Sequence, residues 1–361
     1  MNMKKQDIIR NISISGKEPL VNALKQMDRT GRKLLLVFDG NRFAGLVSIG
    51  DIQRALIRNT GLQEKINSIL RTNIRIAGPN DSFEEIKNLM VKMRIECMPV
   101  VDSNNQLVDV FLWEDLFGET GPAAEVSLNI PVVIMAGGQG IRLKPLTNVL
   151  PKPLLPVGDK TIIEYIIERF GRIGCSHFFL SVNYKSELIK HFLAQAAADY
   201  NIEYFQEDKP LGTAGSLFLL KNKIHTSFFV TNCDILVDQD YSEIYNYHHE
   251  QKNDITLVAA LKHYNIPYGT LESGDNGQLT AFREKPELTF KINTGLYILE
   301  PGTLERIPEN TFFNITDLID ILFKEKRKVG VFPISENSWK DIGGWNEYMN
   351  LINGLRKTSN K

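Results

Sequence analysis

The chain has 361 residues, of which 43% are hydrophobic and 24% are charged, a composition that excludes disordered and fibrous proteins. Single cores stop growing somewhere below about 300 residues, so the length predicts two domains. The 42 Lys and Arg residues nearly balance the 43 Asp and Glu residues, which argues against nucleic acid or an anionic membrane as a partner.

The three cysteines are far apart, at Cys97, Cys175 and Cys233, and form no CxxC pair. We therefore expect neither a disulfide framework nor a zinc cluster. No apolar run reaches about 18 residues, and residues 1–10 do not lead into an apolar segment. These features predict a cytoplasmic protein without a signal peptide or membrane span.

An internal repeat of about 63 residues organises the first 120 residues. Each copy has an amphipathic helix, an apolar strand, a turn, a second strand and a helix that opens with aspartate. The elements are predicted at 20–27, 33–39, 43–48 and from Asp51 in the first copy, and at 83–93, 98–102, 107–112 and from Asp115 in the second. Neither copy alone would bury its sheet face, so the two are expected to pack into one α/β module.

This repeat resembles a tandem of CBS domains, which commonly bind adenosine nucleotides between their halves. The resemblance implies that Asp51 and Asp115 contact a ribose and that Ser48 lies near the phosphates. The second copy departs from the family pattern, with Asp109 in place of glycine and Leu112 in place of a hydroxyl residue. Aspartate also caps helices well, so capping alone, or a module that serves only dimerisation, stays open as an alternative.

Residues 121–130 show no periodic apolar pattern and are interpreted as a linker between a domain at 1–120 and a domain at 131–361. In the second domain strands alternate with helices. The strands are predicted at 131–135, 177–182, 202–204 and 227–231, and the helices at 162–173, 185–197 and 215–219. This order predicts an α/β fold with a doubly wound, mostly parallel, Rossmann-like sheet.

A buried strand runs directly into a glycine-rich loop within residues 132–147. Glycines let backbone N–H groups approach a triphosphate, and Arg142 supplies a bidentate charge for phosphate oxygens. Leu143 stands where a dinucleotide fingerprint needs its third glycine, and no GK[ST] follows. Hydride transfer and P-loop hydrolysis are therefore disfavoured. The expected nucleotide-binding residues of the loop are Ala136, Gly137, Gly138 and Gly140.

After the loop, three prolines stiffen the segment 150–157 and hold Lys152, which can meet a second phosphate. The sequence GGxGxRLxPLT followed by PKPLLPV resembles the signature of the sugar-1-phosphate nucleotidyltransferases, and the resemblance spans nearly all of residues 131–350. It implies that Gly212, in the segment 207–215, makes the closest approach to the nucleobase.

The same resemblance implies the other substrate and metal sites. Asp234 and Asp341 would hold one Mg²⁺, because oxygen ligands and phosphate substrates favour that ion. Lys285 would neutralise the sugar phosphate. The expected contacts to the sugar are Gly269, Glu284, Asn293 and Thr294. His248 and His249 look like a metal pair, but without a third ligand they are interpreted as surface residues.

The resemblance implies transfer of a nucleotidyl group from a nucleoside triphosphate to a sugar 1-phosphate, with release of pyrophosphate. A CBS tandem fused to this domain resembles the bacterial glucosamine-1-phosphate guanylyltransferases of legionaminic acid synthesis, which favours GTP and glucosamine 1-phosphate. Mannose-1-phosphate guanylyltransferase and glucose-1-phosphate thymidylyltransferase stay open, as do a non-catalytic regulatory subunit and an adenylate sensor. We expect a homo-oligomer.

Overall fold

The computed structural model describes residues 3–71, 74–93, 95–113, 116 and 127–359. Its contacts divide the chain into two compact units, Met1–Glu125 and Val126–Lys361. The predicted linker at 121–130 lies partly outside the described residues.

Within the described part of the chain, no helix is both long enough and apolar enough to cross a bilayer. Cys97, Cys175 and Cys233 are all buried and free.

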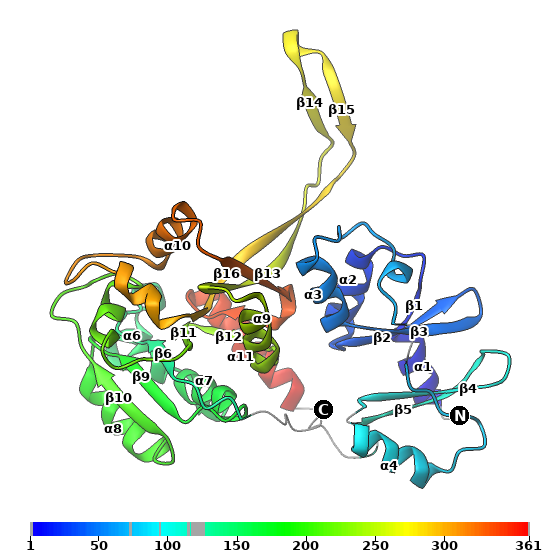
Figure 1. Ribbon diagram of the computed structural model, residues 1–361, viewed down its shortest axis with the longest axis horizontal. Helices are drawn as coiled ribbons and strands as arrows, with labels where there is room; N and C mark the ends of the chain where they lie inside the picture. Colours follow the sequence, from blue (N-terminus) through cyan, green and yellow to red (C-terminus); the bar gives the residue numbers. More distant parts are fainter. Residues whose placement is uncertain (1–2, 72–73, 94, 114–115, 117–126, 360–361) are drawn as a thin grey trace. The chain divides into compact units, whose positions relative to one another are not determined.

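The first unit shows the predicted repeat (Figure 1). Strand β1 pairs in parallel with β2, and β2 pairs antiparallel with β3. The second copy follows the same plan, since Ala77 makes a parallel bridge to Val100 of β4, and β4 pairs antiparallel with β5. The helix predicted from Asp115 involves residues outside the described ranges. The elements are α1 (Met3–Asn11), β1 (Ser13–Ser15), α2 (Leu20–Thr30), β2 (Leu34–Asp39), β3 (Arg42–Ser48), α3 (Ile49–Ile57), η1 (Ile66–Ser68), α4 (Phe83–Met93), β4 (Cys97–Val101) and β5 (Leu107–Leu112).

The second unit is built on a seven-stranded sheet with the order β10-β9-β6-β11-β16-β13-β17. All of its strands run in one direction except β16, which is antiparallel to both of its neighbours. The mostly parallel α/β sheet expected from the sequence is thereby confirmed. Its strands are β6 (Val132–Met135), β9 (His177–Ser181), β10 (Asn201–Phe205), β11 (Phe228–Asn232), β13 (Ile255–Asn265), β16 (Glu287–Leu299) and β17 (Val329–Ser335).

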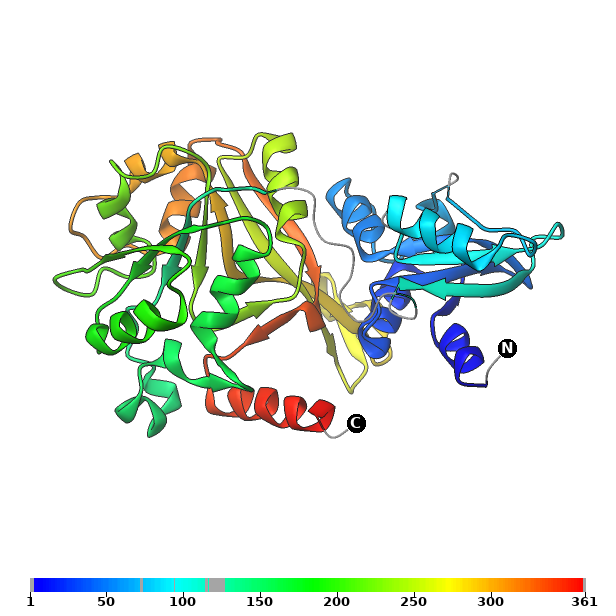
Figure 2. The ribbon, with the colours of Figure 1, turned by 90° about the horizontal axis from the view of Figure 1, so that it is seen from below.

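Helices cover both faces of this sheet (Figure 2). Side chains alternate along β11, so Phe228 and Val230 join a core with η4 and α10, whereas Phe229 contacts Phe170 of α7 and Tyr241 of α9 on the other face. The helices are η2 (Ile141–Leu143), α6 (Leu146–Val149), η3 (Lys152–Leu154), α7 (Ile162–Gly171), α8 (Ser186–Ala196), η4 (Gly215–Leu220), α9 (Tyr241–Gln251), η5 (Asp275–Gly277), η6 (Pro301–Arg306), α10 (Ile315–Lys324), η7 (Glu336–Ser338) and α11 (Trp345–Ser359).

Two short strand pairs complete the unit, β7 (Pro156–Val157) with β8 (Lys160–Thr161) and β12 (Ile235–Val237) with β18 (Trp339–Asp341). A third pair, β14 (Thr270–Ser273) with β15 (Leu279–Arg283), extends the ribbon of β13 and β16 into an arm that projects from its unit (Figure 1). Apolar side chains on the arm are strongly exposed, with Tyr268 at 75% and Leu271 at 67%.

His248 is not a surface residue, which corrects the interpretation from the sequence. Its side chain is 1% exposed, because the polar helix α9 packs this position against β13. The ring Nδ1 lies 2.8 Å from Thr256 Oγ1, and Nε2 lies 3.1 Å from Glu300 Oε1. Burial lowers the pKa of His248, although the hydrogen bond to Glu300 partly offsets that effect. The neighbouring His249 is exposed.

A buried neutral histidine makes stability depend on pH. In the unfolded chain His248 has its ordinary pKa of about 6.5, so the unfolded state takes up the proton first as the pH falls. The contribution of the neutral His248 to the free energy of unfolding is therefore complete above pH 6.5 or so, and it declines as the pH falls toward the lowered pKa of the folded state. We expect His248→Asn to reduce the drop in melting temperature of the second unit between pH 7.5 and 5.5. Calorimetry tests this, with His249→Asn as the control that should leave the drop unchanged.

Candidate active site

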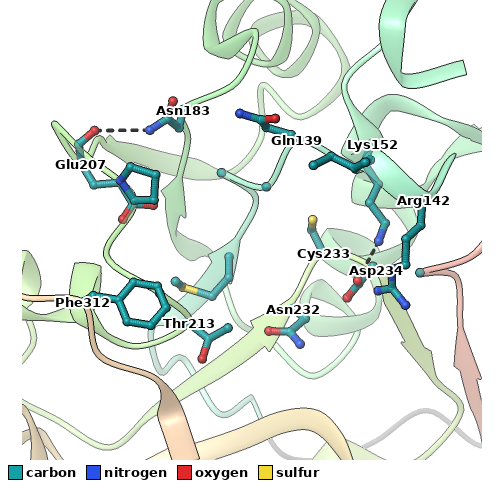
Figure 3. Close-up of a pocket in the computed structure, with 18 residues that line it drawn as sticks. Gln139, Arg142, Lys152, Asn183, Glu207, Thr213, Asn232, Cys233, Asp234 and Phe312 are labelled. Atoms are coloured by element: carbon teal, nitrogen blue, oxygen red, sulfur yellow. Dashed lines mark hydrogen bonds and ion pairs between the residues drawn. The ribbon is translucent and has the colours of Figure 1, made fainter. Parts of the chain in front are cut away.

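A cavity of about 630 Å³ opens where the parallel strands β6, β9, β10 and β11 end (Figure 3). Ligands of doubly wound sheets bind at this edge, beside the point where the strand order reverses. Here β9 lies on one side of β6 and β11 on the other. The cavity is lined by Met135, Gly137, Gly138, Gln139, Gly140, Ile141, Arg142, Lys152, Asn183, Glu207, Pro210, Gly212, Thr213, Asn232, Cys233, Asp234, Phe312 and Gly343.

The loop after β6 leaves no room for a side chain at Gly140. This residue has a φ of 63°, and a Cβ atom there would lie 2.8 Å from Thr147 Cγ2 and 3.2 Å from Lys152 Cβ. Thr147 Oγ1 also donates a hydrogen bond of 3.0 Å to the Gly140 carbonyl. Gly137 and Gly138 line the cavity, whereas Ala136 is buried behind it. The loop thus brings bare backbone to the cavity wall.

Lys152 and Asp234 form an ion pair within the cavity. The Lys152 Nζ lies 2.6 Å from Asp234 Oδ2, and the two side chains are 8% and 23% exposed. Lys152 belongs to η3, in the proline-rich segment, and Asp234 lies between the end of β11 and the start of β12. The pair holds the Lys152 ammonium group at a fixed place in the cavity wall, and its contact with a phosphate stays a prediction.

A second cavity of about 260 Å³ is lined by Arg142 and Asp234, which also line the first. Asp341 lines it too, because β12 pairs with β18 and the Ile342 N–H donates a bond of 2.7 Å to the Asp234 carbonyl. Its remaining lining residues are Asn232, Ile235, Asn293, Thr294, Gly295, Tyr297 and Trp339.

The donor set fits Mg²⁺ bound together with substrate. Among the described residues, no group of three or more His, Cys, Asp and Glu side chains could enclose a metal ion. Asp234, just before β12, and Asp341, at the end of β18, supply carboxylate oxygens. Mg²⁺ usually takes one or two carboxylates and fills its octahedron with water and substrate phosphates.

Gly343 separates Asp341 from Arg142. A Cβ atom at Gly343 would lie 2.7 Å from both Arg142 Nη2 and Asp341 Oδ1. Its N–H donates a 2.6 Å hydrogen bond to Asp341 Oδ1.

We expect Gly343→Ala to displace the side chains of Arg142 and Asp341 and to lower kcat/KM at least about tenfold, because charges that are positioned for the reaction would move. Steady-state kinetics test this, and a wild-type rate would show that their placement is not critical. Gly302→Ala is a control, since a Cβ there meets nothing within 4 Å.

The loop at 210–215 is locked onto the segment 311–315. The N–H groups of Ala214 and Gly215 both donate to the Phe313 carbonyl, and the Phe313 N–H donates to the Leu211 carbonyl. Gly212 has a φ of 81°, and a Cβ atom there would lie 2.7 Å from the Phe313 carbonyl oxygen. This interlock brings Phe312 to the same end of the cavity as Thr213 (Figure 3).

The predicted sugar-site residues fall into two groups. Asn293 and Thr294 line the smaller cavity, and Asn293 Nδ2 donates a 2.8 Å hydrogen bond to the Tyr297 hydroxyl. Gly269, Glu284 and Lys285 lie near the strands of the arm and line neither cavity. A Cβ atom at Gly269 would lie 2.9 Å from Glu284 Oε2, so these two residues are close to each other. Their role in sugar binding stays a prediction.

In the first unit, Ser48 and Asp51 form a capping box at the start of α3. Asp51 Oδ1 also accepts from Arg54 at 2.7 Å and from Arg71 at 2.5 Å. Burial alone would raise the pKa of Asp51, but hydrogen bonds from Arg71, Ser48 and Arg54 outweigh it and lower the pKa. Capping is thus observed, and a ribose contact stays a prediction. Asp115 lies outside the described residues.

Several cavity residues were not identified from the sequence. Asn183 and Glu207 each follow the carboxyl end of a predicted strand, and that position was an available signal. Phe312 lies in an irregular segment, where no sequence pattern indicates proximity to the site.

Comparison with known families matches residues 131–358 to the nucleotidyl transferase family, and residues 6–58 and 66–119 to CBS domains. A mannose-1-phosphate guanyltransferase from Schizosaccharomyces pombe is 31% identical over 238 residues, which cover 62% of this chain and 65% of that protein. A mannose-1-phosphate guanylyltransferase catalytic subunit beta from Drosophila pseudoobscura is 34% identical over 193 residues and 52% of each chain. The chain thus spans between about half and about two thirds of the length of these relatives.

Among solved structures, one assigned as a glucose-1-phosphate thymidylyltransferase from Bacillus anthracis, in complex with sucrose, has a TM-score of 0.52 and 21% identity. The match covers 63% of this chain and 95% of that one. At this identity the likeness concerns the fold.

Proposed function

The chain belongs to the nucleotidyl transferase family and carries two CBS domains, and from that premise we propose that it transfers a nucleotidyl group from GTP to a sugar 1-phosphate, releasing pyrophosphate. The observation that carries this proposal is the cavity at the carboxyl edge of the sheet. The glycine loop, Arg142, Lys152 and Asp234 line it, and Asp341 lines the smaller cavity together with Arg142 and Asp234. Support for a guanylyl group comes from the names of the two relatives.

The reaction joins two anions. A phosphate oxygen of the sugar 1-phosphate attacks the α-phosphorus of GTP while pyrophosphate departs in line. The attacking phosphate is already ionised, so no general base is required. Catalysis then depends on positioning and on neutralising charge.

Each cationic residue has a place in this scheme. Lys152, fixed by Asp234, neutralises the transferring phosphoryl group. Arg142 lines both cavities and stabilises the departing pyrophosphate. Lys285, which lines neither cavity, would neutralise the sugar phosphate. Asp234 and Asp341 would hold Mg²⁺, which supplies Lewis-acid stabilisation of phosphate oxygens when bound.

Two sugars are favoured by different observations. Both relatives are named for mannose 1-phosphate. The fusion of a CBS tandem to the transferase domain instead resembles the glucosamine-1-phosphate enzymes. Pyrophosphate release should therefore be measured for GTP, dTTP, UTP, CTP and ATP against mannose, glucosamine, glucose and N-acetylglucosamine 1-phosphates. Turnover of GTP with any of these sugar 1-phosphates supports the proposal. Turnover only with another nucleotide rejects the transfer of a guanylyl group.

We further propose that the CBS pair binds an adenine nucleotide and adjusts this activity. Support comes from the two matched CBS domains and from the arginines that surround Ser48 and Asp51. Adding AMP, ADP or ATP to the same assay tests it, and an unchanged rate with all three would reject regulation. A non-catalytic regulatory subunit would instead bind nucleotide without turnover of any pair.

A further inference from the structure

The arm that projects from the second unit has one apolar face and one polar face (Figure 1). Leu271 lies opposite Phe282 in the strand pair, and Leu279 points to the same side of the ribbon. The polar face carries an ion pair, in which Arg283 Nη2 lies 3.3 Å from Glu272 Oε1. All three apolar side chains are more than half exposed. The arm therefore presents an apolar face to its surroundings.

The apolar surface of the arm and of the ribbon below it is about as large as one side of a standard protein interface. Seven large apolar side chains there are between 38% and 75% exposed, namely Tyr264, Tyr268, Leu271, Leu279, Phe282, Leu288 and Phe290. At about 200 Å² for a whole side chain, they expose on the order of 700 Å². Each partner in a standard interface contributes roughly 800 Å², and apolar patches of this size mark sites of protein contact.

Lys285, where the arm joins β16, is a cation without a partner. Arg283 is paired with Glu272, whereas the side chain of Lys285 makes no hydrogen bond or ion pair with any residue that the structure describes. Its φ is 44°, in the left-handed region that residues with a side chain seldom adopt. Backbone strain of this kind concentrates at functional sites. Lys285 is thus available for contact with a ligand or with another chain.

The ribbon keeps Lys285 away from the smaller cavity of its own chain. Strand β16 pairs with β13 without interruption from Glu287 to Asn293, and Asn293 lines that cavity. Six residues of strand span about 20 Å, far more than the length of a lysine side chain. While this ribbon is intact, Lys285 cannot reach the smaller cavity of its own chain.

The smaller cavity complements an added cation. Among the described residues that line it, Asp234 and Asp341 are acidic and only Arg142 is basic. Asp234 is paired with Lys152, whereas no described basic side chain forms an ion pair with Asp341. A bound sugar phosphate would add further negative charge. Charge complementarity therefore favours a second copy of this chain as the partner of the arm, because that copy offers this cavity to Lys285.

We propose that two copies of this chain exchange arms, so that the apolar face of each arm packs against the other copy and Lys285 completes the smaller cavity of that copy. In a two-fold dimer the same contact occurs twice, because each chain carries both an arm and a cavity. The part that Lys285 takes in the active site rests on the proposed function. The exchange of arms does not depend on it.

The sharpest test combines two inactive variants. Asp234→Asn alters the cavity and keeps the arm, whereas Lys285→Ala alters the arm and keeps the cavity. We expect each alone to lose at least about tenfold in kcat/KM. When the two are co-expressed, about half of the dimers are mixed and one site in each has both residues intact, so turnover should recover to about a quarter of the wild-type rate.

Co-expression of Asp234→Asn with Lys152→Ala is the matched control. Both residues belong to the cavity of one chain, so no mixed dimer has an intact site and the rate should not recover. If Asp234→Asn and Lys285→Ala also fail to complement each other, or if Lys285→Ala alone keeps wild-type turnover, the arm does not complete the partner's site.

Sedimentation tests the arm surface without reference to catalysis. Leu271→Ser combined with Phe282→Ser should halve the mass of the wild-type particle, because the centre of the apolar face is lost. Phe323→Ser is the control, since Phe323 is also strongly exposed but belongs to α10. A monomeric wild type, or a double variant that sediments like the wild type, would overturn the exchange of arms.

If no pair of substrates is turned over, the proposed function fails, and crosslinking decides whether the arm reaches the other copy's cavity. Chains with Lys285→Cys are mixed with chains with Asn293→Cys and treated with a short bismaleimide. We expect mass spectrometry to find position 285 of one chain joined to position 293 of the other. Absence of this link would reject the exchange.

Discussion

Replacing Asp234 by asparagine should lower kcat by at least about a hundredfold, comparable to losing one preorganised charge at a reacting centre. The carboxylate accepts from the buried Lys152 at 2.6 Å and lines both cavities. The substitution keeps the shape of the side chain but removes half of the carboxylate pair with Asp341. The remaining activity should also need more Mg²⁺.

The measurement is kcat as a function of Mg²⁺ concentration for the wild type and Asp234→Asn. Asp238→Asn is a matched control, because Asp238 lies a few residues along the same segment and its side chain is 57% exposed. The control should keep wild-type turnover. Full activity in Asp234→Asn would remove Asp234 from the metal site.

Lys152→Ala should produce a loss of similar size, at least about a hundredfold in kcat. Its side chain is 8% exposed and its Nζ pairs with Asp234, so the substitution removes a positive charge that is fixed in the cavity wall. Lys160→Ala serves as the control, because Lys160 pairs with Glu168 at the surface and lines neither cavity.

A double variant tests whether Lys152 and Asp234 act as one unit. Groups that act together lose little more when both are removed than when one is removed. We expect Lys152→Ala with Asp234→Asn to be no more than about tenfold slower than either single variant. Losses that multiply in the double variant would mean that the two side chains act independently.

The sequence was most informative where strand order determines position. Asp234 is distant in the chain from Arg142 and Lys152, yet all three line one cavity because β6 and β11 are parallel neighbours that end at the same edge. Gly140 was expected from the glycine-rich loop and Gly212 from the family resemblance, and the structure shows both in a backbone conformation that favours glycine. Local chemistry indicated Arg142 and Lys152, whereas Asp234 was indicated by the family resemblance.

The remaining features depend on tertiary packing. Phe312 reaches the cavity through hydrogen bonds between Phe313 and Leu211, which no local pattern encodes. His248 is buried because of what α9 packs against, although the helix itself is polar. The placement of Gly269 and Glu284 depends on the path of the arm, which the motif alone does not specify. The position of Glu207, at the end of the cavity away from Arg142 and Lys152, also could not be read from the sequence.

Nucleotidyl transfer is tested most directly by a ³¹P NMR spectrum of the wild-type protein with GTP, Mg²⁺ and a sugar 1-phosphate. We expect a nucleoside diphosphate sugar and pyrophosphate in equal amounts, with neither formed when the sugar 1-phosphate is omitted. Release of orthophosphate, or binding of GTP without any product from mannose or glucosamine 1-phosphate, would contradict it.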